Sequence, residues 1–583
     1  MTQVFNAAAS AQGLTVKAYM GDRCVLLAFS LADHLTDQLA GFAIRRTPAS
    51  TVNWTWLGNR LNFEGAYTDP HLSKEGKFFS SDRAPFQKFW WVDFPPDGSS
   101  GRFRYEVVVK RFKDEGTTDL IDDQRVDLEI DVGPFKDGQI EIAFTRGYLS
   151  SQAYADKFHN APFQPKRNEG GWNFSTAPFK EEWTWLGGHG RQAIIDFLND
   201  CHADTTCTLD AMVYDLNEPD LITALELMAK AGRLRLLSDN DPKQHGDDTA
   251  AGQAYAAIKS AATAEQEGNF KRGHFGRFQH NKVLIKRDKS GKALRVLTGS
   301  TNFSITGLYV NANHVVVFDN EAVAEKYGTA FKAAFDADLH RPAFEQKDIS
   351  QHEYDVAEVG LPALKLSFAP HKEPTFSLDT LLDAVNHAES SVIFAVMELS
   401  GKGNVLEALR KIHENPKVFS YGISDDVDES DNTINGTTVY SPRTLAGELV
   451  YSKENPEKFP PPFNTELEVH GAAAHVVHHK FVVVDFNGTK PVVFGGSSNL
   501  ADGGEQLNGD NLFAIYDRAI ATAFAIEGLR LVDHYAFAAA LKREESGGAA
   551  PKPLALKPNK DKWYAAYYQN GNIRQTERLL FSR

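Results

Sequence analysis

Two histidine–lysine pairs recur in the sequence with nearly the same surroundings. In residues 279–303 a His and a Lys two positions later precede a Gly-Ser-x-Asn, and the same order returns in residues 477–500. The separation from His to Asn is 302 − 280 = 22 in the first copy and 499 − 478 = 21 in the second. This agreement indicates a duplicated functional site. Its six chemically competent residues are His280, Lys282, Asn302, His478, Lys480 and Asn499.

These residue types suit attack on a phosphodiester. Positions i and i+2 of a β-strand project to the same side, so each His and its Lys should face one way. Two such strands side by side would collect two imidazoles, two ammonium groups and two Asn amides. The resulting pocket is cationic, and its imidazoles exchange protons near neutral pH. One imidazole can attack phosphorus while the other protonates the leaving oxygen, so we expect neither metal nor cofactor.

The two motifs resemble the signature of the phospholipase D superfamily: His-x-Lys, an Asp five residues after the Lys, and Gly-Ser-x-Asn. The second copy matches fully, with Asp485 in the Asp position, whereas the first has Arg287 there and Asp288 after it. In the family this Asp is mainly structural, so the departure concerns local geometry more than chemistry. The resemblance implies phosphodiester hydrolysis through a phosphohistidine, with transphosphatidylation where an alcohol replaces water.

The two copies differ further along the chain. Eleven residues after the Asn of each motif stands Asn313 in the first copy (313 − 302 = 11) and Asp510 in the second (510 − 499 = 11). In the related tyrosyl-DNA phosphodiesterases, residues of this region support the catalytic histidines across the interface between halves, with a carboxylate behind the nucleophile. By that resemblance Asp510 would orient His280 as the nucleophile. Asn313 would support His478 as the general acid and base.

Other polar residues near the motifs have less specific roles. Ser300 and Ser497 could bind the phosphate or hold the Asn of the same motif, or could simply form the turn beside Gly. Asp215 and Glu398 end corresponding strands and could support the site from outside. A His cluster with Asp485 does not form a closed metal-binding pattern. The remaining nearby histidines lack the duplicated register and are expected to line the cleft or pack: His274, His314, His475 and His479.

The order of elements predicts an α/β duplication behind an all-β domain. Short β-branched and aromatic runs in residues 1–170 are typical of an immunoglobulin-like or fibronectin-III-like sandwich. From about residue 185 strands and helices alternate, and the order repeats 478 − 280 = 198 residues later. Each unit should have αβα layers around a mixed sheet, with both motifs facing one central cleft. The expected domains are a β-sandwich at 1–170, phospholipase D-like units at 171–350 and 351–545, and a tail at 546–583.

Three other stretches carry expectations of their own. Residues 239–253 and 425–464 interrupt the repeat before each motif and are candidate substrate-selecting lids, with plain solvated loops as the alternative. The pentapeptide WTWLG occurs at 54–58 and at 183–187. Trp residues at i and i+2 are typical of one buried strand face.

Composition narrows the function classes. The chain of 583 residues is 42% hydrophobic and 24% charged, which is ordinary for a globular protein. Its net charge of −15 argues against a broad nucleic-acid-binding surface, although not against a locally basic cleft. An odd number of cysteines (Cys24, Cys201 and Cys207) favours reduced packing residues. The sequence shows no signal peptide and no apolar run of about 18 residues, so we expect a cytoplasmic location, with non-classical export and peripheral membrane contact left open.

The function that these observations favour is a phosphodiesterase that acts on a phospholipid, because both motifs lie in one chain and the overall charge is acidic. A metal-independent endonuclease or another nucleic-acid phosphodiesterase is the first alternative. A catalytically inert binding protein is the second. A cardiolipin-synthase-like role would use the same site, but such relatives usually carry N-terminal membrane segments. The oligomeric state is left open.

Overall fold

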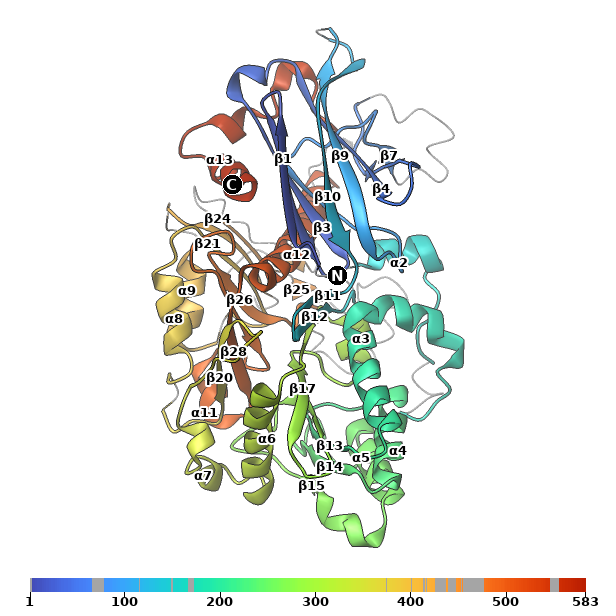
Figure 1. The fold of residues 1–583 in the computed structure, drawn as a ribbon, viewed down its shortest axis with the longest axis vertical. Coiled ribbons are helices and arrows are strands. Elements are labelled where there is room, and N and C mark those ends of the chain that lie inside the picture. Colours follow the sequence, from blue (N-terminus) through green and yellow to red (C-terminus); the bar gives the residue numbers. More distant parts are fainter. Residues whose placement is uncertain are drawn as a thin grey trace.

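The fold has three parts, with a β-sandwich at the top of Figure 1 and two α/β units below it. The computed structural model describes residues 3–583 except 65–77, 115, 148–149, 166–171, 374, 400, 413–414, 416, 425–436, 439–446, 452, 455–475 and 546–554. The candidate lid at 425–464 therefore lies largely outside the described residues, and His475 lies entirely outside them.

The N-terminal part is a sandwich of two four-stranded antiparallel sheets. Alternation along the strands defines its core: Val126, Leu128 and Ile130 are buried, whereas Asp127 and Glu129 between them are exposed. The first sheet has the order β1 (Asn6–Ala11), β2 (Leu14–Gly21), β3 (Cys24–Leu31) and β8 (Trp90–Asp93). The second has the order β10 (Leu120–Val132), β9 (Gly101–Phe112), β4 (Leu39–Pro48) and β5 (Thr55–Trp56). The all-β prediction for this part is confirmed.

The two α/β units contain eight-stranded mixed sheets with the same strand order. The first runs β11 (Phe135–Asp137), β12 (Ile140–Phe144), β18 (His314–Phe318), β17 (Ala293–Gly299), β16 (Lys282–Arg287), β13 (Thr208–Val213), β14 (Leu234–Ser238) and β15 (Phe270–Arg272). The second runs β19 (Tyr354–Val356), β20 (Ala363–Phe368), β28 (Asn511–Tyr516), β27 (Val492–Gly496), β26 (Lys480–Val484), β21 (Ser391–Val396), β22 (Phe419–Ser424) and β24 (Gly447–Tyr451). The predicted duplication is confirmed.

One strand expected in the sandwich belongs elsewhere. The segment 138–147 was expected to be a sandwich strand, but β12 pairs antiparallel with β18 of the first α/β sheet. The hairpin β11–β12 occupies the place that β19–β20 occupies in the second sheet. The first repeat therefore begins earlier in the chain than the alternation of strands and helices indicates. Its first hairpin follows the sandwich strands directly, so the sequence pattern assigns that hairpin to the sandwich. The domain boundaries themselves remain predictions.

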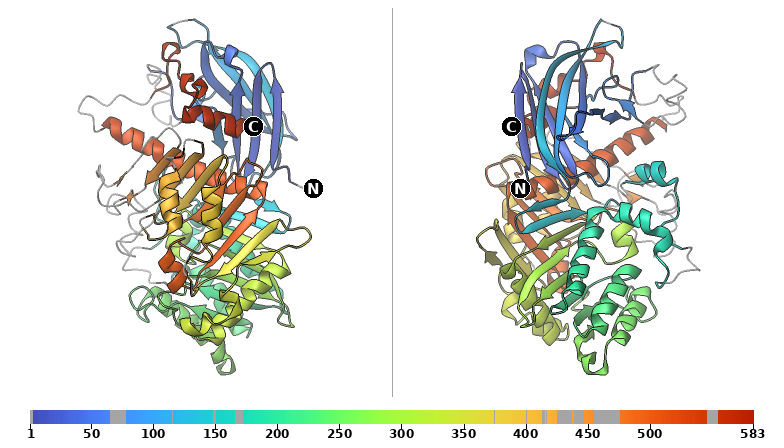
Figure 2. Two further views of the ribbon diagram at one scale, coloured as in Figure 1. Left: turned by 90° about the vertical axis from the view of Figure 1, so that its left-hand side faces the viewer. Right: turned by 45° about the vertical axis from the view of Figure 1, so that its right-hand side comes forward.

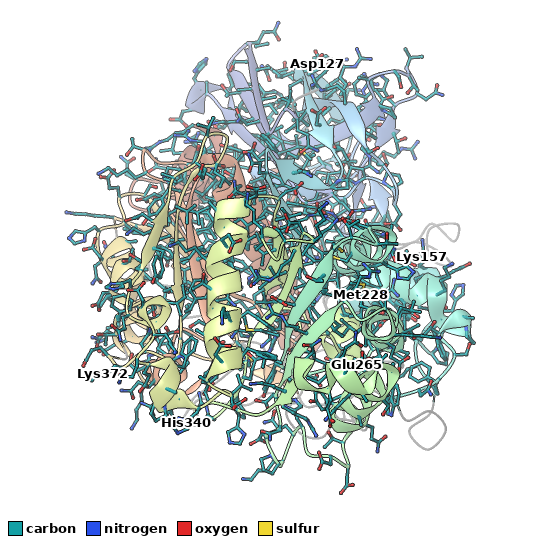
Figure 3. The ribbon with its side chains drawn as sticks, turned by 60° about the horizontal axis from the view of Figure 1, so that its bottom comes forward. Asp127, Lys157, Met228, Glu265, His340 and Lys372 are labelled. Carbon is teal, nitrogen blue, oxygen red and sulfur yellow. The ribbon has the colours of Figure 1, made fainter. Side chains whose placement is uncertain are left out.

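Helices cover both faces of each α/β sheet (Figures 1 and 2). The first sheet lies between α6 (Glu321–Asp336) and the group α3 (Lys180–Ala203), α4 (Pro219–Lys230) and α5 (Ala250–Ala261). The second lies between α12 (Arg518–Glu545) and the pair α8 (Asp379–Asn386) and α9 (Asn404–Lys411). Figure 3 shows the molecule from below, where Asp127 marks the sandwich, Met228 the buried face of α4, and Lys372 the second unit.

Shorter elements complete the described chain. The helices are α2 (Ser151–Phe158), α7 (Arg341–Phe344), α11 (Asp502–Leu507) and α13 (Ile573–Ser582). Two small sheets pair β6 (Gly58–Asn59) with β7 (Phe79–Ser80) and β23 (Thr437–Thr438) with β25 (Lys453–Glu454).

The C-terminal tail returns to the sandwich. The ring nitrogen of Trp563 donates to the carbonyl of Leu39 at 2.9 Å, and the hydroxyl of Tyr19 donates to the carbonyl of Phe581 at 2.7 Å. Helix α12 contacts β2 on one side and the second α/β sheet on the other. The tail and α12 thus join the first residues of the chain to its last unit, a contact that the sequence alone did not assign.

The second WTWLG copy corrects a local prediction. Residues 183–187 were expected on a buried strand face, but they lie in α3, where Trp183 is buried and stacks on Tyr309 with ring centroids 4.6 Å apart. Trp183 and Trp185 therefore lie on a helix and not on a strand. Gly188, with φ of 54°, marks the kink in this helix.

Candidate active site

Each motif is placed by a strand and by the turn after the next strand. Lys282 and Lys480 are the first residues of β16 and β26, and each His stands two residues earlier. The Gly of each Gly-Ser-x-Asn ends β17 or β27 with positive φ, 146° at Gly299 and 141° at Gly496. A Cβ at either glycine would lie 2.3 Å from a carbonyl oxygen of the neighbouring strand. Only Gly permits this turn, which begins the segment that contains the motif Asn.

The two halves meet at the histidines. The backbone nitrogen of His280 donates to the carbonyl of Gly509 at 2.9 Å, and that of His478 donates to the carbonyl of Ala312 at 3.1 Å. Parallel β-bridges join Gln279 to Gly509 and Val477 to Ala312. Each bridge connects the residue before a catalytic His with the residue before Asp510 or Asn313 of the other half. Pseudo-twofold packing therefore places each His against the opposite unit.

Asp510 and Asn313, the predicted support residues, each lie against the catalytic His of the other half. Nδ1 of His280 lies 2.7 Å from Oδ1 of Asp510, and the hydroxyl of Ser497 donates to the same oxygen at 2.7 Å. Nδ1 of His478 lies 2.9 Å from Oδ1 of Asn313. In both cases Nδ1 is occupied by an oxygen acceptor, which leaves Nε2 as the reactive nitrogen.

Ser300 has the role in the first half that Ser497 has in the second. Its hydroxyl donates to Oδ1 of Asn313 at 2.8 Å. The two motif serines therefore hold the support residues within their own units, Asn313 and Asp510. Among the described residues, neither hydroxyl forms a hydrogen bond with the Asn of its motif, and phosphate binding by these serines stays a prediction.

The site is buried and rich in positive charge. His280, Lys282, His478 and Lys480 are 4%, 1%, 7% and 1% exposed. Burial, with the Lys282 ammonium beside it, lowers the pKa of His280 to about 4, although Asp510 opposes the shift. Burial and the charge of Lys480 also hold the pKa of Lys282 well below its usual value. His280 is therefore a neutral imidazole at neutral pH, the form required of a nucleophile.

A family model matches both α/β units. Residues 194–335 and 381–527 match the family model for the cardiolipin synthase, PLD-like domain. The chain belongs to the phospholipase D superfamily. No curated protein matches the sequence.

Several solved structures are similar to parts of this chain at low identity. Phosphatidylserine synthase from Haemophilus influenzae Rd KW20 is 12% identical over 58% of this chain and 85% of its own, with a TM-score of 0.38. Nuc from Salmonella typhimurium, a phospholipase D family member, is 21% identical over 25% and 86%, with a TM-score of 0.20. The yeast tyrosyl-DNA phosphodiesterase H432N mutant is 10% identical over 55% and 87%, with a TM-score of 0.30. Polyphosphate kinase from Porphyromonas gingivalis is 10% identical, with a TM-score of 0.38. The match spans 64% of this chain and 53% of the kinase.

The Asn residues of the two phospholipase D motifs each have an unpaired side-chain oxygen among the described residues. Oδ1 of Asn302 and Oδ1 of Asn499 are both buried and have no hydrogen-bond partner among the described residues. Buried polar atoms are normally paired, so these two amide oxygens, at the same place in both halves, lack the partner that such atoms usually have.

Arg287 stands where the second motif has an Asp, and the carboxylate that it binds belongs to Asp210 on the neighbouring strand β13. Its Nε binds Oδ2 of Asp210 at 2.5 Å, and Arg235 binds the two oxygens of that carboxylate at 2.7 Å each. Asp485 in the second motif instead accepts hydrogen bonds from the backbone nitrogens of Glu389, Ser390 and Ser391. Both residues anchor the end of a motif strand, and neither contacts the catalytic histidines.

The structure adds two residues that the motifs did not identify. Tyr214 packs edge-on against His280 with ring centroids 4.6 Å apart, and its ring lies 4.6 Å from Nζ of Lys282. Met397 occupies the equivalent place in the second half, with its sulfur 3.9 Å from Nζ of Lys480. The signal was their position directly after β13 and β21, one residue past the partners of the motif lysines.

The remaining candidates surround the site without joining the catalytic pairs. Asp215 and Glu398 follow Tyr214 and Met397 in equivalent register, as predicted, and Asp215 lies 3.9 Å from Nε2 of His245. His274 is exposed and contacts Asn240. His314 and His479 are fully buried and contact each other.

The described residues show neither a metal-binding cluster nor a membrane-spanning helix. The described residues contain no group of three or more His, Cys, Asp or Glu side chains arranged to hold a metal ion. Within the same part of the chain, no helix combines the length and the apolar character needed to cross a membrane.

Proposed function

We propose that this protein cleaves phosphodiesters through a phosphohistidine on His280, with His478 as general acid and base. The observation that carries the proposal is the unequal support of the two imidazoles. A carboxylate, Asp510, lies behind His280, and an amide, Asn313, lies behind His478. A carboxylate on Nδ1 makes Nε2 more basic and stabilises the imidazole as it gains positive character, whereas an amide fixes orientation without adding charge.

The first step forms a P–N bond and breaks a P–O bond. Nε2 of neutral His280 attacks phosphorus, and protonated His478 gives the proton on its Nε2 to the leaving oxygen. The ammonium groups and the amides are placed to hold the non-bridging oxygens and to stabilise the charge that develops on them. These groups belong to Lys282, Lys480, Asn302 and Asn499.

The second step restores the enzyme. His478, now neutral, removes a proton from water, and the water oxygen attacks the phosphohistidine. The new P–O bond forms while the bond from phosphorus to Nε2 of His280 breaks. An alcohol in place of water would give transphosphatidylation by the same atoms.

A phospholipid is the proposed substrate. Support comes from the matching family model, whose description is that of a cardiolipin synthase domain, and from the net charge of −15, which disfavours a broad nucleic-acid-binding surface. Both catalytic motifs also lie in one chain, whereas many nucleases of the superfamily assemble the site from two chains. A cytoplasmic location remains the prediction for the protein.

The test begins with a generic substrate. Wild-type protein and the variants His280→Ala and His478→Ala are compared in the hydrolysis of bis(p-nitrophenyl) phosphate, and we expect turnover by the wild type alone. Equal, slow hydrolysis by all three proteins would leave only the inert binding protein.

The substrate class is tested separately, in EDTA, with phosphatidylcholine vesicles, single- and double-stranded DNA, and RNA. Release of free choline supports the phospholipid proposal. Cleavage of nucleic acid without lipid activity would replace the lipid by a nucleic-acid substrate.

A further inference from the structure

The residue after each catalytic His makes a second contact across the interface between the halves. Asn281 follows His280, and its Oδ1 accepts a hydrogen bond from Nδ2 of Asn511 at 2.8 Å. His479 follows His478, and its Nδ1 lies 3.4 Å from Nδ1 of His314. The four positions are equivalent in the two repeats, and they form two layers of the interface. One layer holds the amide pair Asn281 and Asn511, and the other holds the imidazole pair His314 and His479.

The imidazole pair ends on a buried carboxylate. Nε2 of His479 lies 3.2 Å from Oε1 of Glu527 on α12, and Arg530 binds both oxygens of that carboxylate. His314 and His479 are 0% exposed and Glu527 is 5% exposed. In the part of the chain that the structure describes, no carboxylate is bonded to the amide pair, and Asn511 instead accepts hydrogen bonds from the hydroxyls of Thr298 and Tyr327.

The carboxylate fixes the protons of both imidazoles. Burial opposes ionisation of Glu527, but Arg530 and His479 outweigh it and lower its pKa to about 2. Burial lowers the pKa of His479 and of His314, as does the nearby charge of Lys480, so both rings are neutral at pH 7. A carboxylate only accepts hydrogen bonds, so Nε2 of His479 carries its proton and Nδ1 is left as an acceptor. The facing Nδ1 of His314 must then be the donor.

The same order of donors continues to His478. Oγ of Ser300 lies 3.2 Å from Nδ1 of His314 and accepts from the backbone nitrogen of His314 at 3.1 Å. The single proton on Nδ1 of His314 is shared between Nδ1 of His479 and Oγ of Ser300, and the backbone N–H of His314 also points at that oxygen. The hydroxyl of Ser300 therefore turns its own proton to Oδ1 of Asn313, 2.8 Å away. The amide nitrogen of Asn313 donates to the carbonyl of Gly307 at 2.8 Å, which fixes its oxygen toward His478.

We propose that Glu527, His479 and His314 are positioning residues that act through Ser300 and Asn313 to hold His478 with its proton on Nδ1. Nε2 is thereby kept for proton exchange with the leaving group and with water. This role rests on the proposed function, because His478 is the general acid and base there. Asp510 supports His280 directly, and this relay supplies the other half with a carboxylate at longer range.

The principal variant is the double substitution His314→Asn and His479→Asn, which replaces the imidazole pair by the amide pair found in the other layer. The substrates are p-nitrophenyl methyl phosphate and phenyl methyl phosphate, which differ in how much the leaving oxygen needs a proton. We expect kcat/KM for the phenyl ester to fall about 10-fold more than for the p-nitrophenyl ester, because loss of an outer hydrogen-bonding partner typically costs about 10-fold to 100-fold. A purely structural defect would lower both by the same factor, and that result, or no loss for either ester, would overturn the proposal.

Tyr327→Phe is the matched control, since it removes a buried hydroxyl that contacts Asn511 in the corresponding layer of the other half. We expect it to leave the ratio between the two esters unchanged, and a ratio that shifts as much as in the double variant would also contradict the relay. If the double variant does not fold, Glu527→Gln keeps both imidazoles and removes only the charge at the end of the relay. It should change the ratio in the same direction.

A second measurement separates failure of the relay from failure of the proposed function. The ¹⁵N chemical shifts of the His478 ring report which nitrogen is protonated, and no turnover is needed. We expect protonated Nδ1 in the wild type at pH 8 and a shift toward the mixed tautomer in the double variant. Identical shifts in both proteins would rule out the relay even if wild type proves active, and a wild type inactive on every ester would refute the proposed function alone.

Discussion

Asp510 lies 2.7 Å from Nδ1 of His280, although the two residues belong to different halves of the duplicated chain. In the reciprocal contact, His478 faces the amide of Asn313 at 2.9 Å. The pseudo-twofold packing thus creates two sites of the same shape that differ by one negative charge. This difference separates the chemical roles of two imidazoles that the motifs alone make equivalent.

The separation of roles predicts opposite outcomes for two simple variants. His280→Asn should form no phosphoenzyme from bis(p-nitrophenyl) phosphate, because it lacks the nucleophile. His478→Asn should still form it, since p-nitrophenolate leaves without much help from an acid, but should release it about 100-fold to 10,000-fold more slowly. Quenching in alkaline denaturant, followed by phosphate analysis of the denatured protein, measures both. Rapid turnover of the intermediate in His478→Asn would contradict the assignment.

The ion pair that replaces the motif Asp predicts a stability effect. Asp210 is 1% exposed and is shared by Arg235 and Arg287, so Asp210→Asn leaves a buried guanidinium without its counter-charge. We expect the free energy of unfolding to fall by about 3 kcal/mol. Asp200→Asn is the control, because its side chain is 47% exposed beside Lys286 and should contribute less than about 1 kcal/mol. Urea unfolding measures both, and equal losses would contradict the prediction.

Much of this site could be predicted because its residues are local in sequence. The strand period of two places each His and Lys on one face, and the Gly of each turn needs positive φ, so the spacing of the motif encodes the geometry. The residues Asn313 and Asp510 were also within reach, since they stand at the same distance from each motif.

Contacts between distant strands were not predictable in the same way. The partner of Arg287 lies 77 residues earlier, on a strand whose register with β16 no local pattern specifies. The hairpin β11–β12 has the same β-branched composition as the sandwich strands before it, and only its pairing with β18 separates them. The Trp residues of α3 were predicted to lie on a strand because their spacing of two matches the strand period. That spacing alone does not exclude a helix.

Acid pH should destabilise the fold through buried histidines. Burial lowers the pKa of His280, His371 and His534 to about 4 in the folded protein, against about 6.5 when unfolded. The unfolded chain therefore binds protons first as pH falls, so stability is complete above about pH 6.5 and is lost toward pH 4. Glu505, whose pKa burial raises to about 7, acts in the opposite direction, as does His189, whose pKa Asp22 and Glu141 raise to about 9 against the effect of burial.

The measurement is the melting temperature of the wild type at pH 7, 6 and 5, which should decrease in that order. The matched variant is His371→Asn, whose amide can replace the donor that contacts the carbonyl of Ser350 at 2.7 Å. It should show a shallower decrease because one buried imidazole is gone. A melting temperature that rises toward pH 5 would contradict the linkage.

The last helix should stabilise the junction between the sandwich and the second α/β unit. Phe581 of α13 is 0% exposed, and its ring lies 5.9 Å from Trp90 of the sandwich and 5.5 Å from Phe419 of β22. Phe581→Ala should lower the free energy of unfolding by about 3 kcal/mol. Leu579→Ala, at a 38% exposed position of the same helix, should cost much less. Thermal unfolding of both variants checks the difference, and a similar cost at the two positions would show that α13 is not part of the common core.

Exchange of the two support residues should exchange the roles of the histidines. The double variant Asp510→Asn and Asn313→Asp keeps the size of each side chain and moves the carboxylate from His280 to His478. If the carboxylate selects the nucleophile, quenched wild-type enzyme should carry phosphate on His280 and the double variant on His478. Peptide mapping under alkaline conditions locates the modified residue, because phosphohistidine survives there. The single variant Asp510→Asn is the control and should lose about 10-fold to 100-fold in kcat/KM without moving the phosphate. Phosphate on His280 in both the wild type and the double variant would show that features other than Asp510 assign the nucleophile.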